Sequence, residues 1–227
     1  MISTCQTQVP ILIELIIFDS DGVLVDSEKI ALSVLARAAA DEGISIDLEE
    51  AKRLFRGLKF ADCVREIERR LGRRVGEDFE AGVRRATALA FEAELQPVEG
   101  IHAALAEITL PFCVASNGPM SKIRHALGLT KLLNYFEGRI FSAYDVGSWK
   151  PDPDLFLHAA QTFGIAPARC VVIEDSLSGV TAAHAAGMQV IGFSGGDPDV
   201  ELQLAPVCAN LLQQMRDLPK LLKMGGR

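Results

Sequence analysis

Short apolar runs alternate with longer amphipathic stretches over most of the chain. Apolar residues recur at helical spacing in the intervals between the later runs, for example in 154–163 and 177–186. Strands that alternate with helices of this length predict a parallel sheet with right-handed crossovers, and therefore an α/β fold. The runs predicted as strands are rich in branched and aromatic side chains and end in polar or turn residues: 15–18, 112–115, 139–141, 170–173 and 189–193.

The interval between the first and second apolar runs is far longer than one crossover helix requires. Its apolar residues recur at helical spacing, and no run between 45 and 94 has the pattern of a strand. We therefore predict an all-helical domain, residues 29–94, inserted into a Rossmann-like α/β core formed by residues 11–28 and 95–227. The clearest helical patterns in the insertion are 32–39, 64–71 and 78–94.

Composition excludes several classes of function. Hydrophobic residues make up 49% of the 227 residues and charged residues 23%, as in ordinary globular enzymes. A formal net charge of −7 argues against a nucleic-acid-binding protein, which usually carries a basic face. No apolar run reaches the ~18 residues that a membrane helix needs, and the first ten residues lack the features of a secretory signal. The five cysteines form no C-x-x-C pair, so we expect reduced thiols in a cytoplasmic protein. From the net charge and the lengths of the apolar runs we expect no nucleic-acid or membrane partner.

Polar clusters directly follow the predicted strands. Asp19-Ser20-Asp21-Gly22 comes after the first strand and Ser116-Asn117-Gly118 after the second; Lys150-Pro151-Asp152-Pro153 and Glu174-Asp175-Ser176 come later. Each cluster alone has an ordinary explanation as a helix cap, a turn or a solvated loop. The carboxyl ends of parallel strands meet at one edge of a sheet, where ligands bind. Together the clusters supply the nucleophile, cation ligands, phosphate donors and proton source that phosphoryl transfer requires.

In this order the four clusters resemble the motifs of the haloacid dehalogenase superfamily of phosphotransferases, over about residues 14–193. The helical insertion is similar to the cap of the phosphoglucomutase and phosphoglycolate phosphatase branch. The resemblance implies that Asp19 is the nucleophile that forms an aspartyl-phosphate, and that Asp21 protonates the leaving oxygen and then activates water. It also implies Mg²⁺ held by the Asp19 carboxylate, the Asp21 backbone carbonyl and Asp175, with Glu174 as a further ligand or a partner of the ligands.

The resemblance gives roles to the remaining motif residues as well. Ser116 and the backbone N–H of Asn117 would bind the phosphoryl oxygens, and Lys150 would offset negative charge on the nucleophile and phosphate. Asp21 separates the chain from haloacid dehalogenases, which lack an acid at this position. It also separates the chain from phosphonate hydrolases, which have a small residue there and a catalytic lysine in the cap.

The choice between a phosphatase and a mutase depends on the cap loop at 55–60. β-Phosphoglucomutases carry a Lys-Gly-Val-Ser-Arg loop whose arginine binds a second phosphate, and that arginine aligns with Phe60 here. The departure favours a hydrolase, with β-phosphoglucomutase-like phosphoryl transfer as the alternative.

Two longer stretches, 111–119 and 144–153, look like the bacterial 6-phosphogluconate phosphatase group. This likeness implies that the substrate is a small sugar or sugar-acid phosphate, such as 6-phosphogluconate. Arg56 and Lys59 are then the candidate contacts to its polar or carboxylate end. The alternative is that both cations are merely solvated on the surface of the cap.

Two other classes of protein share part of this pattern. Phospho-receiver domains also hold an aspartyl-phosphate beside Mg²⁺, but they have roughly half this length, carry the aspartate after the third strand and lack a cap. A non-catalytic binding protein could use the same scaffold, but every side chain that catalysis requires is present. We therefore predict a Mg²⁺-dependent phosphomonoesterase that acts on a small phosphorylated metabolite, as a monomer or weak homodimer.

Overall fold

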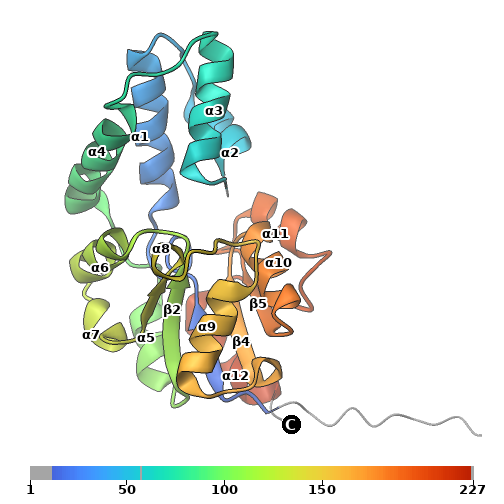
Figure 1. Cartoon of the computed structure of the whole chain (residues 1–227). Helices are drawn as coiled ribbons and strands as arrows, with labels where there is room; N and C mark the ends of the chain where they lie inside the picture. Colours follow the sequence, from blue (N-terminus) through green and yellow to red (C-terminus); the bar gives the residue numbers. More distant parts are fainter. Residues whose placement is uncertain (1–11, 57, 226–227) are drawn as a thin grey trace, which may run out of the picture.

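A six-stranded parallel sheet forms the centre of the core in the computed structural model, which describes residues 12–56 and 58–225 (Figure 1). The strand order β3-β2-β1-β4-β5-β6 confirms the predicted α/β fold. Strand β6 was not predicted, since it is a three-residue edge strand that begins with an exposed asparagine. The strands are β1 (Leu15–Phe18), β2 (Phe112–Ser116), β3 (Ile140–Ser142), β4 (Cys170–Glu174), β5 (Gln189–Phe193) and β6 (Asn210–Leu212).

Strand β1 lies in the middle of the sheet, and all four of its residues are fully buried. Because side chains alternate along a strand, it contributes to the core on both faces. Ile16 and Phe18 belong to one apolar cluster, and Leu15 and Ile17 belong to the other. The next residue, Asp19, still donates its backbone N–H to the carbonyl of Ile173 on β4, at 3.0 Å. Asp19 therefore leaves the sheet from a rigid, buried position.

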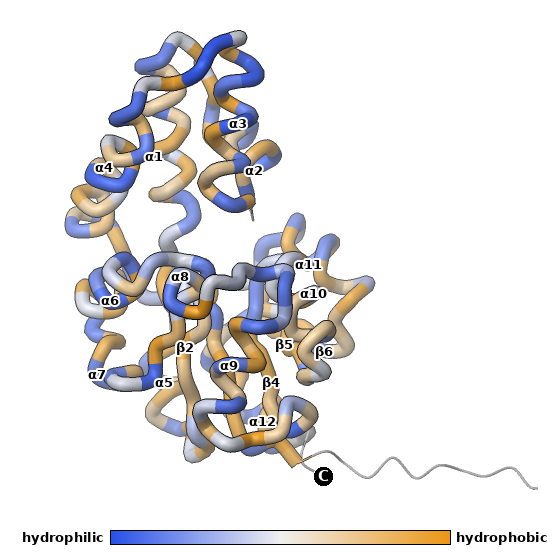
Figure 2. The backbone as a smooth tube through the Cα atoms, viewed as in Figure 1, coloured by the Kyte–Doolittle hydropathy of each residue, from blue (hydrophilic) through white to orange (hydrophobic). Residues whose placement is uncertain are grey.

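Helices cover both faces of the sheet. The cluster of Ile16 and Phe18 includes buried residues of α5 (Ile101–Glu107), α6 (Met120–Leu129) and α7 (Leu133–Phe136), with α12 (Leu218–Gly225) beside them. Figure 2 shows that apolar positions are concentrated in the central strands. The opposite cluster includes residues of α8 (Ala143–Val146), α9 (Asp154–Phe163), α10 (Leu177–Ala185) and α11 (Pro198–Leu204).

Four further helices lie between β1 and β2 in the sequence and stand above the carboxyl edge of the sheet as a helical cap (Figure 1). They have an apolar cluster of their own, which includes Leu35, Phe55, Ile67 and Val83. The second of them is short and was not predicted as a separate helix; its N-terminus is capped by the side chain of Asp47. The helices are α1 (Glu28–Asp41), α2 (Leu48–Phe55), α3 (Phe60–Leu71) and α4 (Phe79–Glu94).

The two connections between cap and core lie side by side. Asp26 donates its backbone N–H to the carbonyl of Gln96, and Val98 donates to the carbonyl of Leu24, both at 3.0 Å. The chain therefore enters and leaves the cap through one hydrogen-bonded pair of segments. The exact limits of the inserted domain at residues 29 and 94 stay predictions, and residues 11, 226 and 227 lie outside the described part of the chain.

Two expectations about the chain as a whole can be compared with the structure. In the described residues, no helix is long and apolar enough to cross a membrane. Four of the five cysteines are buried free thiols, namely Cys63, Cys113, Cys170 and Cys208. Cys5 lies outside the described residues.

Candidate active site

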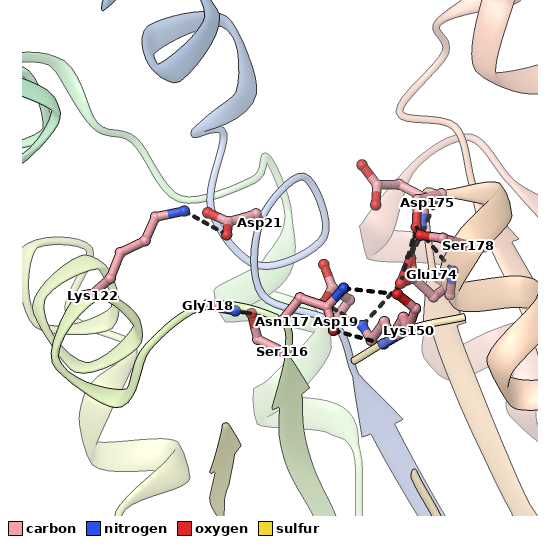
Figure 3. Close-up of polar contacts among 12 residues, drawn as sticks. Asp19, Asp21, Ser116, Asn117, Gly118, Lys122, Lys150, Glu174, Asp175 and Ser178 are labelled. Atoms are coloured by element: carbon pink, nitrogen blue, oxygen red, sulfur yellow. Dashed lines mark hydrogen bonds and ion pairs between the residues drawn. The ribbon is translucent and has the colours of Figure 1, made fainter. Parts of the chain in front are cut away.

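The four polar clusters meet above the carboxyl ends of β1, β2 and β4, as the sequence predicted (Figure 3). Asp19 follows β1, while Ser116 and Glu174 are the last residues of their strands. Lys150 comes from the loop between α8 and α9. All four side chains are buried, although each is polar or charged. Buried charges are stable only when they are paired, so their partners define the site.

Lys150 pairs with two carboxylates at once. Its Nζ lies 2.5 Å from Oδ1 of Asp19 and 2.9 Å from Oε1 of Glu174. The ammonium also lies 4.9 Å from the centroid of the Phe156 ring. Burial alone would lower the pKa of Lys150, but the two carboxylates outweigh burial and hold the pKa above its ordinary value. Lys150 is therefore a fixed positive charge beside the proposed nucleophile.

Both carboxylate oxygens of Glu174 accept hydrogen bonds. While Oε1 accepts from Lys150, Oε2 accepts from the backbone N–H groups of Asp175 at 2.7 Å and Ser176 at 3.1 Å. The N-terminal part of α10 packs tightly on this side chain, since a Cβ on Gly179 would lie 1.7 Å from Oε1 of Glu174. Glycine at 179 is thus required for the helix to approach so closely.

The side chain of Asn117 fixes the loop that carries Lys150. Its Oδ1 accepts from the backbone N–H of Lys150 at 2.9 Å, and its Nδ2 donates to the backbone carbonyl of Lys150 at 3.3 Å. Only the backbone N–H of Asn117 was given a role from the sequence, so this side-chain contact was not predicted. In the 116–118 loop, which carries Asn117, Oγ of Ser116 accepts from the backbone N–H of Gly118 at 3.2 Å. The predicted phosphate-binding residues and Lys150 therefore form one connected unit.

Asp21 points away from Asp19 and has different partners (Figure 3). Its two carboxylate oxygens accept from the hydroxyl of Ser27 at 2.5 Å and from Nζ of Lys122 at 2.7 Å. Ser27 precedes α1, where a serine ordinarily caps the helix, but its hydroxyl is used for Asp21 instead. Burial would raise the pKa of Asp21, but Lys122 and Ser27 outweigh burial and lower it. Neither of these two partners was singled out from the sequence.

The pKa of Asp19 is shifted in the opposite direction. Burial raises the pKa of Asp19 to about 7, with the negative charge of Glu174 adding to burial and Lys150 opposing it. Burial also raises the pKa of Asp175, to which Glu174 and Asp19 add. The two acids of the first motif thus have different electrostatic environments in the absence of a cation, and the carboxylate whose pKa is lowered is that of Asp21, not that of Asp19.

The carboxylates of Asp19, Glu174 and Asp175 form a group that could hold a cation. Each offers an oxygen, and these oxygens lie within 4.8 Å of one another. Gly22 belongs to the same site, because a Cβ there would lie 2.0 Å from Oδ2 of Asp175 and its φ is +81°. An all-oxygen ligand set suits a hard divalent cation such as Mg²⁺.

The cap loop contacts the core through both of its predicted substrate-binding residues. Arg56 pairs with Glu28 of the cap, and its Nη2 lies 3.0 Å from Oδ2 of Asp197 in the core. Lys59 places its Nζ 5.9 Å from the centroid of the Trp149 ring. Arg56 is therefore not a freely solvated cation. The predicted contact of Arg56 and Lys59 with substrate stays a prediction.

A cavity of about 500 Å³ opens between the cap and the core beside Asp175. Its walls include Gly22, Glu28, Arg56 and Asp197. Asp175, one of the three carboxylate residues, thus borders a space at the cap–core boundary.

Comparison with known proteins places this site in a family. Residues 13–187 match the family model of the haloacid dehalogenase-like hydrolases. The 6-phosphogluconate phosphatase of Escherichia coli is 36% identical over 215 residues, which cover 94% of this chain and 96% of the relative.

Two solved structures share the whole architecture. A conserved haloacid dehalogenase-like protein of unknown function from Agrobacterium tumefaciens has a TM-score of 0.85 and 34% identity, covering 95% of this chain and 100% of its own. A haloacid dehalogenase family hydrolase from Deinococcus radiodurans, solved with bound phosphate and sodium, has a TM-score of 0.79 and 30% identity, with coverage of 95% and 97%. Together with the helical cap and the buried contact of Lys150 with Asp19 and Glu174, these matches show that the chain belongs to the haloacid dehalogenase-like hydrolases. It is a phosphatase of that family.

Proposed function

We propose that the chain is a Mg²⁺-dependent phosphatase that hydrolyses the phosphate ester of a small sugar or sugar acid, such as 6-phosphogluconate, through an aspartyl-phosphate on Asp19. The observation that carries the proposal is the buried contact of Lys150 with both Asp19 and Glu174. Similarity over nearly the whole chain to a 6-phosphogluconate phosphatase supports this substrate class. A location in the cytoplasm and a monomeric or weakly dimeric state stay predictions.

The charges of the site support a divalent cation. Three carboxylates, those of Asp19, Glu174 and Asp175, lie together with the single ammonium of Lys150, which leaves an excess of negative charge. Mg²⁺ would be held by Asp19, Asp175 and the backbone carbonyl of Asp21, with Glu174 as a further ligand or as the partner that orients Lys150. When bound, the ion would offset charge on the phosphoryl group and orient it.

The protein's own residues divide the reaction into two steps. A carboxylate oxygen of Asp19 attacks phosphorus and the ester bond to the leaving oxygen breaks. Asp21, which this step requires in its protonated form, gives that oxygen its proton. Asp21, now ionised, then takes a proton from the water that attacks the aspartyl-phosphate, which releases phosphate and restores Asp19. Ser116, the Asn117 N–H and Lys150 bind the phosphoryl oxygens throughout, while the cap excludes bulk water.

Replacement of the nucleophile tests this division of roles. Asp19→Asn keeps the shape of the side chain but removes its nucleophilic charge, so we expect kcat to fall by about 10⁴-fold or more. Asp217→Asn, at an exposed position that belongs to none of the four polar clusters, is the matched control and should keep full activity. The measurement is phosphate release from 6-phosphogluconate and p-nitrophenyl phosphate, with circular dichroism to establish that the fold is intact. Substantial turnover by folded Asp19→Asn would exclude the proposed nucleophile.

Stabilisation by Mg²⁺ should depend on pH. The pKa of Asp19 is raised to about 7 and that of Asp175 is also raised. Without a cation the folded state therefore binds more protons than the unfolded state between about pH 4 and 7, and its free energy of unfolding falls as the pH rises. Because Mg²⁺ binds ionised carboxylates, the melting temperature should increase more on addition of Mg²⁺ at pH 8 than at pH 5.

The variant Asp175→Asn is the control for this melting experiment, since it should lose most of the Mg²⁺-induced increase at pH 8. An equal increase at both pH values, or one that survives in Asp175→Asn, would contradict the assignment of these carboxylates as ligands.

The two cap cations are tested through substrate preference. If Arg56 and Lys59 contact the polar end of the substrate, Arg56→Ala and Lys59→Ala should each raise KM for 6-phosphogluconate by about tenfold, because one charge-assisted hydrogen bond is lost. KM for p-nitrophenyl phosphate should change much less. Lys52→Ala on the same cap, where the lysine pairs with Glu49, is the control. If the ratio of KM for 6-phosphogluconate to KM for p-nitrophenyl phosphate is unchanged in both Arg56→Ala and Lys59→Ala, these residues do not select the substrate.

A further inference from the structure

Lys122 lies beside the proposed proton donor and has no role in the reaction as described above. It belongs to the first turn of α6, which follows the 116–118 loop. Its Nζ lies 2.7 Å from Oδ2 of Asp21 (Figure 3). About a third of the side chain is exposed. Lys122 is therefore a half-buried charge beside Asp21 rather than part of the buried group around Lys150.

Three elements surround the Lys122 side chain. Its stem passes over the 116–118 loop, since a Cβ on Gly118 would lie 3.7 Å from Cδ of Lys122. Its Nζ lies 5.8 Å from the centroid of the Phe91 ring, on helix α4 of the cap. Asp21 forms the third side. The ammonium thus occupies the space between the proposed phosphate site, the proton donor and the cap, where the leaving group of a substrate has to lie.

A bound substrate would compete with Lys122 for Asp21. Both carboxylate oxygens of Asp21 already accept hydrogen bonds, one from Ser27 and one from Lys122. The ester oxygen of a substrate must reach the same carboxyl group to receive its proton. Ser27 is fully buried and fixed at the start of α1, whereas the flexible four-carbon stem of Lys122 can move its ammonium without moving the backbone. Lys122 is therefore the partner that is displaced.

The displaced ammonium requires new acceptors close by. A lysine ammonium has three donors and no acceptor, and the stem of Lys122 remains anchored beside Gly118. The nearest acceptors that a substrate brings are those on the carbon next to the phosphate ester, because the ester oxygen itself faces Asp21.

We infer that Lys122 binds the leaving-group half of the substrate, at the carbon next to the phosphate ester, and selects a carboxylate or hydroxyl over a cation there. The inference rests on the proposed function, because it takes Asp21 as the acid that meets the ester oxygen. It adds a specificity-determining residue from the core to the two in the cap. A residue that only positioned Asp21 would change the turnover of all alkyl esters alike and would not change the preference among them.

Three two-carbon phosphate esters separate these possibilities. The three esters differ in the group that lies beyond the carbon bearing the phosphate ester. This group is a carboxylate in 2-phosphoglycolate, a hydroxyl in ethylene glycol phosphate and an ammonium in phosphoethanolamine. Each is measured as a competitive inhibitor of p-nitrophenyl phosphate hydrolysis by the full chain with Mg²⁺, so that an inhibition constant is obtained whether or not the ester is turned over. The proteins compared are the unmodified chain, Lys122→Met, Lys122→Glu and the exposed control Lys220→Met on α12.

The unmodified chain and Lys220→Met should bind phosphoglycolate more tightly than phosphoethanolamine. In Lys122→Met the inhibition constant of phosphoglycolate should rise by about ten- to a hundredfold, the loss expected for one charge-assisted hydrogen bond, while that of phosphoethanolamine stays level or falls. Lys122→Glu should reverse the preference.

If the ratio of the two constants is the same in Lys122→Met as in the unmodified chain, Lys122 does not contact the leaving group and the inference is wrong. Absence of p-nitrophenyl phosphate and 6-phosphogluconate hydrolysis by the unmodified chain would instead refute the proposed function itself.

Discussion

The candidate site depends on one buried ammonium, that of Lys150, held between the carboxylates of Asp19 and Glu174. A charge removed from water to this extent is tolerated only with well-placed opposite charges, so each member of the cluster requires the others. The surrounding contacts serve this pairing. The amide of Asn117 fixes the backbone of Lys150, two backbone N–H groups fix Glu174, and the absence of a side chain at Gly179 lets α10 approach. The parallel sheet supplies the common edge at which these segments meet.

Two neighbouring acids at the same edge have different partners. Asp19 continues a buried strand and faces Lys150, whereas Asp21 faces Ser27 and Lys122. Burial favours the neutral form of both acids. For Asp19 burial prevails over Lys150, whereas for Asp21 Lys122 and Ser27 together outweigh burial, so the pKa values of the two acids move in opposite directions. The paired segments that join cap and core begin directly after these acids. Only a few residues of the chain therefore separate these two acids from the segments that lead into the cap.

Much of this arrangement could be predicted from the sequence because it follows from local patterns. Buried parallel strands are near-continuous apolar runs, and a polar residue at the end of such a run lies at the ligand-binding edge. The short β6 and α2 were missed because three or eight residues carry too little periodicity to separate them from loops. The partners of Asp21 were missed for another reason. Lys122 is one lysine on a surface helix and Ser27 is one serine before a helix, and only the folded chain brings them to the same carboxylate.

Direct detection of the phosphorylated residue tests the central claim, that Lys150 and its partners prepare Asp19 as a nucleophile. The chain would be mixed with excess 6-phosphogluconate and Mg²⁺, quenched with acid within the first turnover, digested and analysed by mass spectrometry. The account predicts that the peptide containing Asp19 gains the mass of one phosphoryl group, and that Asp19→Asn does not. Phosphate release with no modified peptide at any quench time, or with the phosphoryl group on another residue, would contradict it.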